Sequence, residues 1–487
     1  MEAASVRRLI PGVKIWVTAG DVAAHTPADR DRVVDFVRAA SLAVVVLGHM
    51  LMAVVVWDHE VPRVLNLLDE YRALRIATWA LQVMPLFFAA GAVANRRTWE
   101  GAKARGDPWR VWLWARMRRL VRPVVYYLGV WVPLVLVLEA VVPDAASRLA
   151  GLSTQLLWFL GVYIVIVALT PLEQRLARHG LASVAVLVAG IAAIDYLRFH
   201  VLEAFDLANF VLVWMMAATL GLVVRDWNDR HRLRLLAVAG AALAANVVII
   251  RWGPYPLSMV GLPSDRISNM APPTLALAMH TVVIISCLGA LWLPVSRLCR
   301  HPGIWHATCA LGGVAMSAYL WHLTALVLVT IGEHALGLDR PAPHHPHFWI
   351  ATVIHLGVLL GAVVVVVSLV APLEWLPVPW LERLQTPGAG DRWRTATAAF
   401  GAFVCGAALL VLAGTGMQGF PFGRVTRYAG LELTPGLGLG LLTLGLLAAR
   451  AGGRPRLEPL EARPDARRAP GTFAAREAAG GATDRSG

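Results

Sequence analysis

Three ionisable residues lie in the first long apolar run of the chain: Asp35, Arg38 and His49. A charged residue inside such a run is costly, so each is a functional candidate by default. At 100° per residue, the step from Arg38 to His49 brings both side chains to within about 20° of one helix face, about 16 Å apart. Asp35 lies one turn before Arg38 and can pair with it. The spacing predicts an ion pair near one membrane boundary and an imidazole near mid-membrane on the same face.

Each residue also has a plain structural interpretation. Arg38 alone can extend its side chain to the membrane surface, and His49 alone can be a hydrogen-bonded interior residue. The aligned set favours chemistry, because histidine is the side chain best suited to proton transfer near neutral pH. A neutral His49 can take a proton from a hydroxyl nucleophile, and it can also carry a group covalently. The sequence is compatible with both roles.

The elements that must position these groups are membrane helices. Of the 487 residues, 57% are hydrophobic and 15% are charged, whereas soluble domains carry about 25% charged residues. A bilayer-spanning helix needs roughly 20 apolar residues. Windows of this kind lie near 33–57, 76–95, 120–142, 155–172, 181–197, 207–224, 234–251, 274–294, 309–331, 348–371, 396–414 and 431–449. The predicted fold class is therefore an all-α polytopic transmembrane bundle of about 12 helices.

Lys and Arg are distributed unevenly between alternate loops. With the N-terminus inside, inner segments hold 33 of them and outer loops hold 10. Because positive residues are retained on the cytoplasmic side, both termini are expected in the cytoplasm and the protein in a bacterial plasma membrane. The net charge of +13 is then mainly a topology signal, and no nucleic-acid partner is expected. Two outer loops dense in Pro, Gly or His, 251–273 and 332–346, are candidate rims of an acceptor site.

No metal is expected from the cysteines and histidines. The four cysteines show no CxxC spacing, so they give neither a zinc signature nor a disulfide framework. The cluster of His344, His345 and His347 lies among prolines, and an incidental polar loop is the favoured interpretation. A core or boundary position is favoured for His280 and His355.

The segment from Arg32 to His49, with its Asp-x2-Arg-x10-Gly-His pattern, resembles the first helix of the acyltransferase-3 family of integral membrane acyltransferases. Other passages are similar to family motifs and follow in the same order: Met-Pro-Leu-Phe-Phe-Ala-Ala-Gly at 84–91, Arg-x2-Arg before a proline at 116–123, Leu-Trp-Phe-Leu at 157–160 and Ser-Ala-Tyr-Leu-Trp-His at 317–322. The resemblance covers roughly residues 30–378. It implies a ten-helix acyltransferase core, and the two apolar windows after Glu374 depart from the family pattern as added C-terminal helices.

The resemblance also implies an activity, namely transfer of an acyl group from acyl-CoA to a hydroxyl of a sugar, a glycolipid or a glycosylated metabolite. Acetyl is the expected group, and the cell envelope the expected setting. His49 becomes the catalytic histidine, with Arg38 and Asp35 beside it. Arg116 and Arg119 become the paired arginines at the cytoplasmic mouth. Spaced i, i+3 on a helix, they share a face and can form a fork for the phosphates of coenzyme A. The rest of the basic stretch 96–122 is equally well explained as a topological anchor.

Three later residues are weaker candidates for the same site. His322 lies mid-window in the ninth helix beside Tyr319, where a hydrogen-bonded core histidine is the competing interpretation. Glu374 resembles the Glu that ends the family's tenth helix, where an ion pair at the helix end is the favoured role.

Twelve spans with a basic inner face also describe a secondary transporter or exporter. A carrier of the major-facilitator type usually has two six-helix halves joined by a long connection, whereas the connection at 225–233 is short, which favours the enzyme. A lipid-linked glycosyltransferase is a further alternative. The predicted organisation is a cytoplasmic segment at 1–32, the acyltransferase core at 33–378, two added helices at 379–450 and a disordered basic tail at 451–487.

Overall fold

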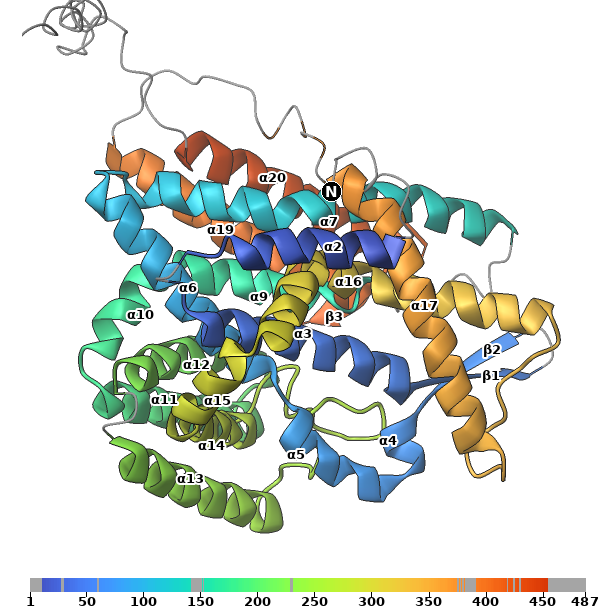
Figure 1. Cartoon of the computed structure of the whole chain (residues 1–487), viewed down its shortest axis with the longest axis horizontal. Helices are drawn as coiled ribbons and strands as arrows, with labels where there is room; N and C mark the ends of the chain where they lie inside the picture. The colour runs from blue at the N-terminus through green and yellow to red at the C-terminus, as the bar shows by residue number, and fades with distance from the viewer. Residues whose placement is uncertain are drawn as a thin grey trace, which may run out of the picture. The chain divides into compact units, whose positions relative to one another are not determined.

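Long helices build almost all of the described chain, and two short hairpins join some of them (Figure 1). The computed structural model describes residues 11–27, 30–58, 61–141, 151, 153–227, 231–374, 376, 378, 381, 391–417, 419–423, 425–428 and 431–453. The predicted tail, from residue 454 on, lies outside the described residues. The elements in chain order are α2 (Pro11–Ala24), α3 (Arg32–Met52), β1 (Ala53–Asp58), β2 (Val61–Asn66), α4 (Leu67–Glu70), η1 (Arg72–Ala77), α5 (Thr78–Leu81), α6 (Met84–Ala104), α7 (Trp109–Val141), α9 (Leu157–Ala168), α10 (Thr170–Ala177), α11 (Leu181–His200), η2 (Glu203–Asp206), α12 (Leu207–Trp227), α13 (Arg232–Trp252), α14 (Leu275–Ala290), α15 (Trp292–Arg300), α16 (Pro302–Ala335), α17 (Phe348–Glu374), α19 (Asp391–Thr415), β3 (Thr426–Tyr428), β4 (Leu431–Leu433) and α20 (Pro435–Gly453).

Ten of the described helical segments are long and apolar enough to cross a membrane. Two bent pairs, α9 with α10 at 65° and α14 with α15 at 61°, raise the number to 12 if each pair is one span. Each predicted window coincides with one of these spans or pairs, so the helical polytopic bundle is confirmed. The first bend has a local cause, because Pro171 in the first turn of α10 has no N–H to continue the hydrogen-bond ladder of α9.

The structure differs from the predicted boundaries in two places. The first helix ends at Met52 rather than near 57, because Ala53–Asp58 forms β1 and pairs antiparallel with β2; its valines and tryptophan favour a strand. The basic stretch 96–122 is helical except for the turn at 105–108, since Lys and Arg are good helix formers. The N-terminal segment contains α2, which packs against α16 and α17.

Helices α3 and α16 pack side by side and run in the same direction. Near their starts, the guanidinium carbon of Arg32 lies 4.9 Å from the centre of the Trp305 ring. Seventeen residues later on each helix, His49 and His322 are in hydrogen-bond contact. The equal spacing, about 25 Å at 1.5 Å per residue, shows that the two helices keep one register between these contacts.

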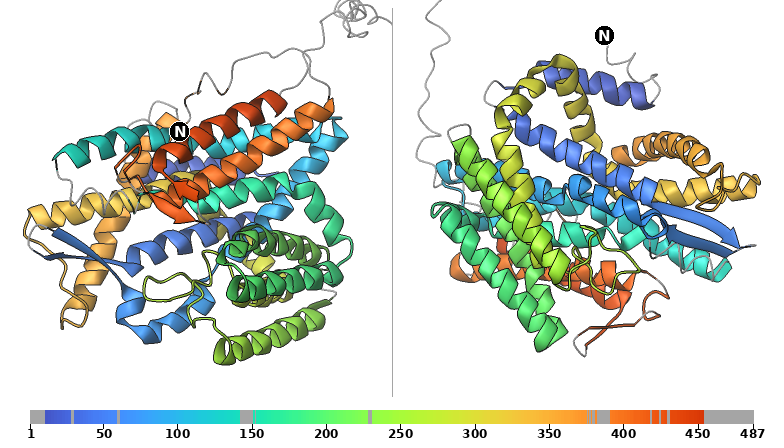
Figure 2. Two further views of the ribbon diagram at one scale, coloured as in Figure 1. Left: turned by 180° about the vertical axis from the view of Figure 1, so that it is seen from behind. Right: turned by 90° about the horizontal axis from the view of Figure 1, so that it is seen from below.

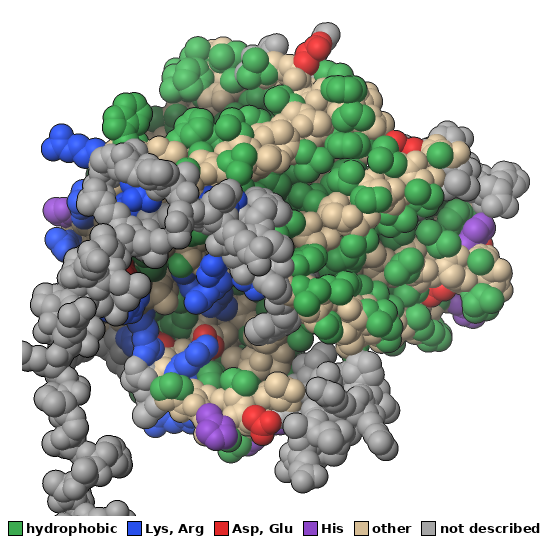
Figure 3. Space-filling view, turned by 90° about the horizontal axis from the view of Figure 1, so that it is seen from above, with side chains coloured by type: hydrophobic (Ala, Val, Ile, Leu, Met, Phe, Trp, Pro, Cys, Tyr) green, Lys and Arg blue, Asp and Glu red, His purple; other side chains and the backbone are tan. Residues whose placement is uncertain are grey.

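The two ends of the bundle differ in charge. We call them the α6–α7 end, after the turn at 105–108, and the hairpin end, after β1 and β2, which lie beside the end of α16 (Figure 2). Viewed from above, Lys and Arg gather at the α6–α7 end, hydrophobic side chains cover much of the middle, and His and acidic side chains mark the hairpin end (Figure 3). This distribution is the one expected of a protein that crosses a membrane with its basic end on one side.

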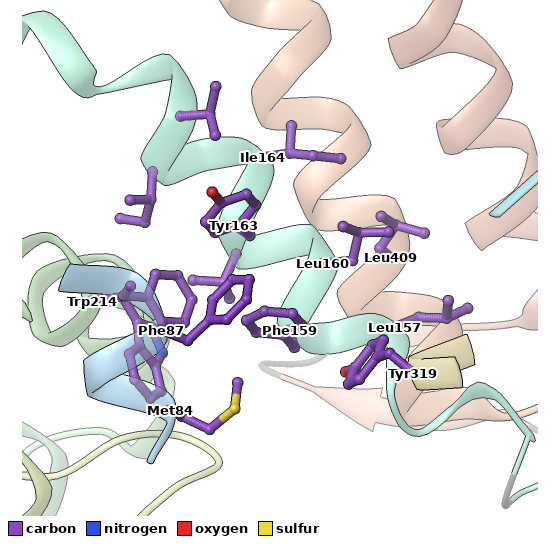
Figure 4. Close-up of a cluster of buried hydrophobic side chains, with 14 of the residues drawn as sticks. Met84, Phe87, Leu157, Phe159, Leu160, Tyr163, Ile164, Trp214, Tyr319 and Leu409 are labelled. Carbon is purple, nitrogen blue, oxygen red and sulfur yellow. The ribbon is translucent and has the colours of Figure 1, made fainter. Parts of the chain in front are cut away.

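Aromatic side chains fill the centre of the bundle (Figure 4). The rings of Phe87 and Phe159 lie edge to face with centroids 5.2 Å apart, and Phe87 and Tyr163 lie 5.5 Å apart. Such edge-to-face pairs are favoured by the ring quadrupoles. Gly91 of α6 makes room for Tyr163, because a Cβ there would lie 2.9 Å from the hydroxyl oxygen. The sequence at 84–91 therefore serves close packing of α6 against α9.

The last two long helices belong to the bundle. Helices α19 and α20 pack tightly on each other, and α19 packs on α9. A Cβ on Gly401 would collide with the backbone of Ala449, and one on Gly161 would collide with the carbonyl of Gly406. Small residues at helix contacts are how membrane helices gain close van der Waals packing. The two C-terminal helices are therefore packed against the core rather than appended beside it.

Candidate active site

Two histidines meet between α3 and α16. The Nδ1 atom of His49 lies 3.2 Å from Nε2 of His322, and the rings are nearly parallel, at 8° with centroids 5.4 Å apart. His322 is fully buried, whereas His49 is partly accessible. The space beside neighbouring Gly48 is open, with no atom within 4 Å of a Cβ built there. His49 is therefore the more accessible histidine of the pair.

The hydrogen bonds assign the protons of the neutral pair. Nδ1 of His322 lies 2.9 Å from the carbonyl oxygen of Tyr319 and 3.1 Å from that of Ala318. A carbonyl only accepts, so Nδ1 of His322 carries a hydrogen and its Nε2 carries a lone pair. That lone pair accepts the Nδ1–H of His49. The Nε2 atom of His49 is then unprotonated and is the atom that can act as a base or nucleophile.

Tyr319 contributes to this arrangement through its backbone. Its hydroxyl donates to the carbonyl of Leu156 at 2.7 Å, and its ring packs edge to face on Phe159. The side chain therefore fixes α16 against the N-terminal end of α9, while the carbonyl orients His322. Of the two weaker sequence candidates on α16, His322 contacts His49 directly and Tyr319 positions His322.

A second cluster contains three arginines. The charge of Arg116, on α7, interacts with those of Arg38, on α3, and Arg119. Arg116 donates to Oδ1 of Asn95 at 2.6 Å, and the Arg38 guanidinium lies 5.6 Å from the centre of the Phe87 ring. The buried Nε of Arg38 has no hydrogen-bond partner. Among the described residues, no carboxylate pairs with Arg38, Arg116 or Arg119, so this part of the bundle carries a positive charge suited to an anion.

The two clusters lie on one face of α3. The separation between Arg38 and His49 is about 16 Å at 1.5 Å per residue. Leu42 and Val45 lie on the same face between them, and Leu42 is buried. Along this face of α3, apolar side chains therefore separate the cation Arg38 from the imidazole of His49. Because α3 ends at Met52, His49 lies in the last turn of the helix.

The predicted pairing of Asp35 with Arg38 was wrong. The Asp35 carboxylate accepts from Nε of Arg30 at 2.6 Å instead. The carboxylate lies in the first turn of α3, where it also complements the positive end of the helix dipole. Asp35 is therefore outside both clusters, and Arg38 remains without a carboxylate partner.

Glu374 and His344 are among the remaining residues considered from the sequence. The side chain of Glu374, at the end of α17, lies outside the described part of the structure. His344 lies in the loop between α16 and α17, where its ring packs obliquely on Tyr71 and approaches Glu70 at 3.7 Å. Over the described residues, no group of three or more His, Cys, Asp or Glu side chains is placed to hold a metal ion.

Sequence reasoning missed Asn95 and Tyr163, two polar residues near Arg116. Asn95 is completely buried in α6, and its Nδ2 has no hydrogen-bond partner. The available signal was an amide at the end of an apolar window. That signal does not predict the contact, because the pairing of Asn95 with Arg116 depends on how α6 and α7 fold back on each other at the turn between them.

Comparison with known proteins gives one positive finding. The family model described as an acyltransferase domain, that of the acyltransferase-3 family, matches residues 31–371. This range contains both histidines and all three arginines. No curated protein and no solved structure matches the chain.

Proposed function

Because the chain belongs to the acyltransferase-3 family and is built as a polytopic membrane protein, we propose that it transfers an acyl group from acyl-CoA to a hydroxyl of a sugar, a glycolipid or a glycosylated metabolite, with acetyl as the expected group. The observation that carries the proposal is the hydrogen bond that leaves Nε2 of His49 free. Acyl transfer to a hydroxyl needs a base at the attacking oxygen, and this nitrogen is the accessible member of the pair.

In this proposal, Nε2 of His49 takes the proton of the acceptor hydroxyl as the oxygen attacks the thioester carbonyl. The imidazolium then returns the proton to the leaving sulfur, so His49 ends the cycle neutral. The new ester bond replaces the thioester bond, and no further reactant is required. Throughout, His322 accepts the Nδ1–H of His49 and so steadies the positive charge that develops on it.

The arginine cluster supplies the donor site. Phosphate groups of acyl-CoA would bind Arg116, Arg119 and Arg38, where fixed guanidiniums favour a polyanion. The pantetheine arm is an extended chain, long enough to bridge the roughly 16 Å between Arg38 and His49. The distribution of Lys and Arg supports placing the α6–α7 end in the cytoplasm. Both termini would then be cytoplasmic in the plasma membrane.

The test compares membranes containing the parental chain and His49→Ala, each given acetyl-CoA labelled in the acetyl group. We expect label in an extractable acceptor only with the parental chain, at equal amounts of inserted protein. Mass spectrometry of envelope lipids and secreted metabolites, with and without the gene, should show the loss of one acyl unit. Transfer by His49→Ala at the parental rate would refute the assignment. The same molecules redistributed across the membrane, without loss of an acyl unit, would indicate a carrier.

A further inference from the structure

Arg116 is held in a different way from other arginines near the α6–α7 end. Its guanidinium donates to the side-chain oxygen of Asn95 at 2.6 Å, and the amide of that residue carries no charge. Four other arginines form ion pairs with carboxylates, namely Arg30 with Asp35, Arg96 with Asp226, Arg105 with Asp107 and Arg225 with Asp31. Arg116 therefore has an uncharged hydrogen-bond partner where these four arginines have an anion.

Contacts between α6 and α7 fix the place of Asn95. The indole Nε1 of Trp112 donates to the hydroxyl of Thr98 at 3.2 Å, and that hydroxyl donates to the backbone carbonyl of Asn95 at 3.0 Å. The rings of Trp99 and Trp112 lie 5.5 Å apart. These contacts and the bond from Arg116 to Asn95 lie almost symmetrically about the turn that joins the two helices, so the helices keep one register. Asn95 is therefore held by contacts that do not involve Arg116.

The amide of Asn95 is destabilising in every respect except its bond to Arg116. The side chain is completely buried, so no water competes for its oxygen. Its Nδ2 has no hydrogen-bond partner, and an unsatisfied buried donor is unfavourable. A leucine of similar size would remove that unsatisfied donor, but it could not accept a hydrogen bond. The chemical property that distinguishes asparagine at this position is thus the oxygen that faces Arg116.

A neutral partner keeps the charge of Arg116 available to a ligand. Arg116 interacts with the like charges of Arg38 and Arg119, so a tether is needed to hold its flexible side chain beside them. A carboxylate at position 95 would bind the guanidinium more strongly, but it would cancel the charge and compete with a phosphate for the same N–H groups. An amide oxygen takes a hydrogen bond and leaves the charge and other N–H donors of the guanidinium.

We propose that Asn95 is a positioning residue for the acyl donor, a neutral tether that orients Arg116 toward the phosphates of acyl-CoA without neutralising it. The inference rests on the proposed function and deepens its donor site. Because Asn95 acts through Arg116, and Arg38 of the same cluster lies about 16 Å along α3 from His49, it should affect donor binding and leave the proton transfer at His49 unchanged.

The experiment measures binding of coenzyme A to the purified full chain in detergent by isothermal titration calorimetry, and initial rates of transfer from labelled acetyl-CoA. Asn95→Asp is nearly isosteric and supplies the carboxylate. Asn95→Leu removes the acceptor altogether. The matched control is Asn66→Asp, which adds the same charge at the hairpin end. Asn66 caps α4 by accepting from the N–H of Leu68 at 2.9 Å, and aspartate caps a helix equally well.

We expect Asn95→Asp to raise the Kd for coenzyme A and the Km for acetyl-CoA about ten- to hundredfold, because an ion pair must be broken before a phosphate can bind. Its kcat should stay at the parental value, and its melting temperature should not fall, since Arg116 gains a stronger partner. Asn95→Leu should raise the same Kd about two- to tenfold through loss of one hydrogen bond. Asn66→Asp should match the parental chain in all four measurements.

Parental affinity for coenzyme A in folded Asn95→Asp or in folded Asn95→Leu would overturn the tether. A weaker affinity that comes with a lower melting temperature in Asn95→Asp would also overturn it, because Asn95 would then serve packing alone. So would an equal loss of affinity in Asn66→Asp, which would indicate a general effect of net charge. A parental chain that does not bind coenzyme A would defeat the proposed function itself, and the role of Asn95 with it.

Discussion

Replacing His322 tests the proton assignment at the heart of the site. In His322→Phe the ring volume is largely kept, but the acceptor 3.2 Å from Nδ1 of His49 is lost. His322 is fully buried, so no water is at hand to replace it, and the loss of such a partner costs about 1–3 kcal/mol. At 1.36 kcal/mol per tenfold, kcat should fall about 5- to 150-fold. His49→Ala should cost more, about 10²- to 10⁴-fold, because the base itself is removed.

His322→Gln is the matched variant, because its side-chain oxygen can take the place of the ring Nε2 and accept from His49. It should retain most of the activity that His322→Phe loses, with the same Km for acetyl-CoA in both. The assay is transfer of labelled acetyl to the extracted acceptor, with thermal melting in detergent to show that both variants are folded. If folded His322→Phe works at the parental rate, or folded His322→Gln is as impaired as His322→Phe, His322 does not hold His49 by this hydrogen bond.

Two further predictions concern the donor site and the packing. Arg116→Gln should raise the Km for acetyl-CoA about tenfold. The control Arg105→Gln, at an exposed arginine of the nearby turn, should leave this Km unchanged. Equal effects of the two variants on initial rates, measured at varied acetyl-CoA concentration, would indicate that Arg116 serves only membrane topology. Gly221→Ala should lower the melting temperature, since the new methyl group would lie 2.6 Å from Ala89 and cost about 1–3 kcal/mol. Gly240→Ala, at a helical position with open space, should match or exceed the parental melting temperature, and a comparable loss in both variants would contradict the packing argument.

The hydropathy of the sequence predicts where the membrane spans lie but not the residues at which their helices begin and end. An apolar window reports what can lie in lipid, and each predicted window contains a span or a bent pair. It does not report where the backbone stops being helical. The helix of Lys103 and that of Arg116 continue far beyond their windows, because long basic side chains favour helix as much as apolar ones do. In the opposite sense, the apolar residues after Met52 form a strand.

For the candidate site too, the sequence predicts what lies within one helix but not the contacts between helices. Helical periodicity was enough to place Arg38 and His49 on one face, because both belong to a single helix. The contact of His49 with His322 joins residues 273 positions apart and depends on the register between α3 and α16, which no local pattern encodes. The predicted ion pair of Asp35 with Arg38 was wrong for a related reason. Helical spacing allowed a bond to Arg38, but Arg30, just before the helix, lies within reach of the same carboxylate.

The separation of the two clusters has a chemical consequence. Water is itself a nucleophile for a thioester, and an activating base beside a wet, charged donor site would promote hydrolysis. Here the base lies about 16 Å along α3 from Arg38, with Leu42 and Val45 on the intervening face. His49 is instead close to the hairpin end, where the Arg340 loop contacts the strand that follows its helix. In the proposed reaction the base therefore lies away from the arginines and toward the hairpin end, so a hydroxyl bound beside His49, rather than solvent at the arginines, would be the nucleophile that it activates.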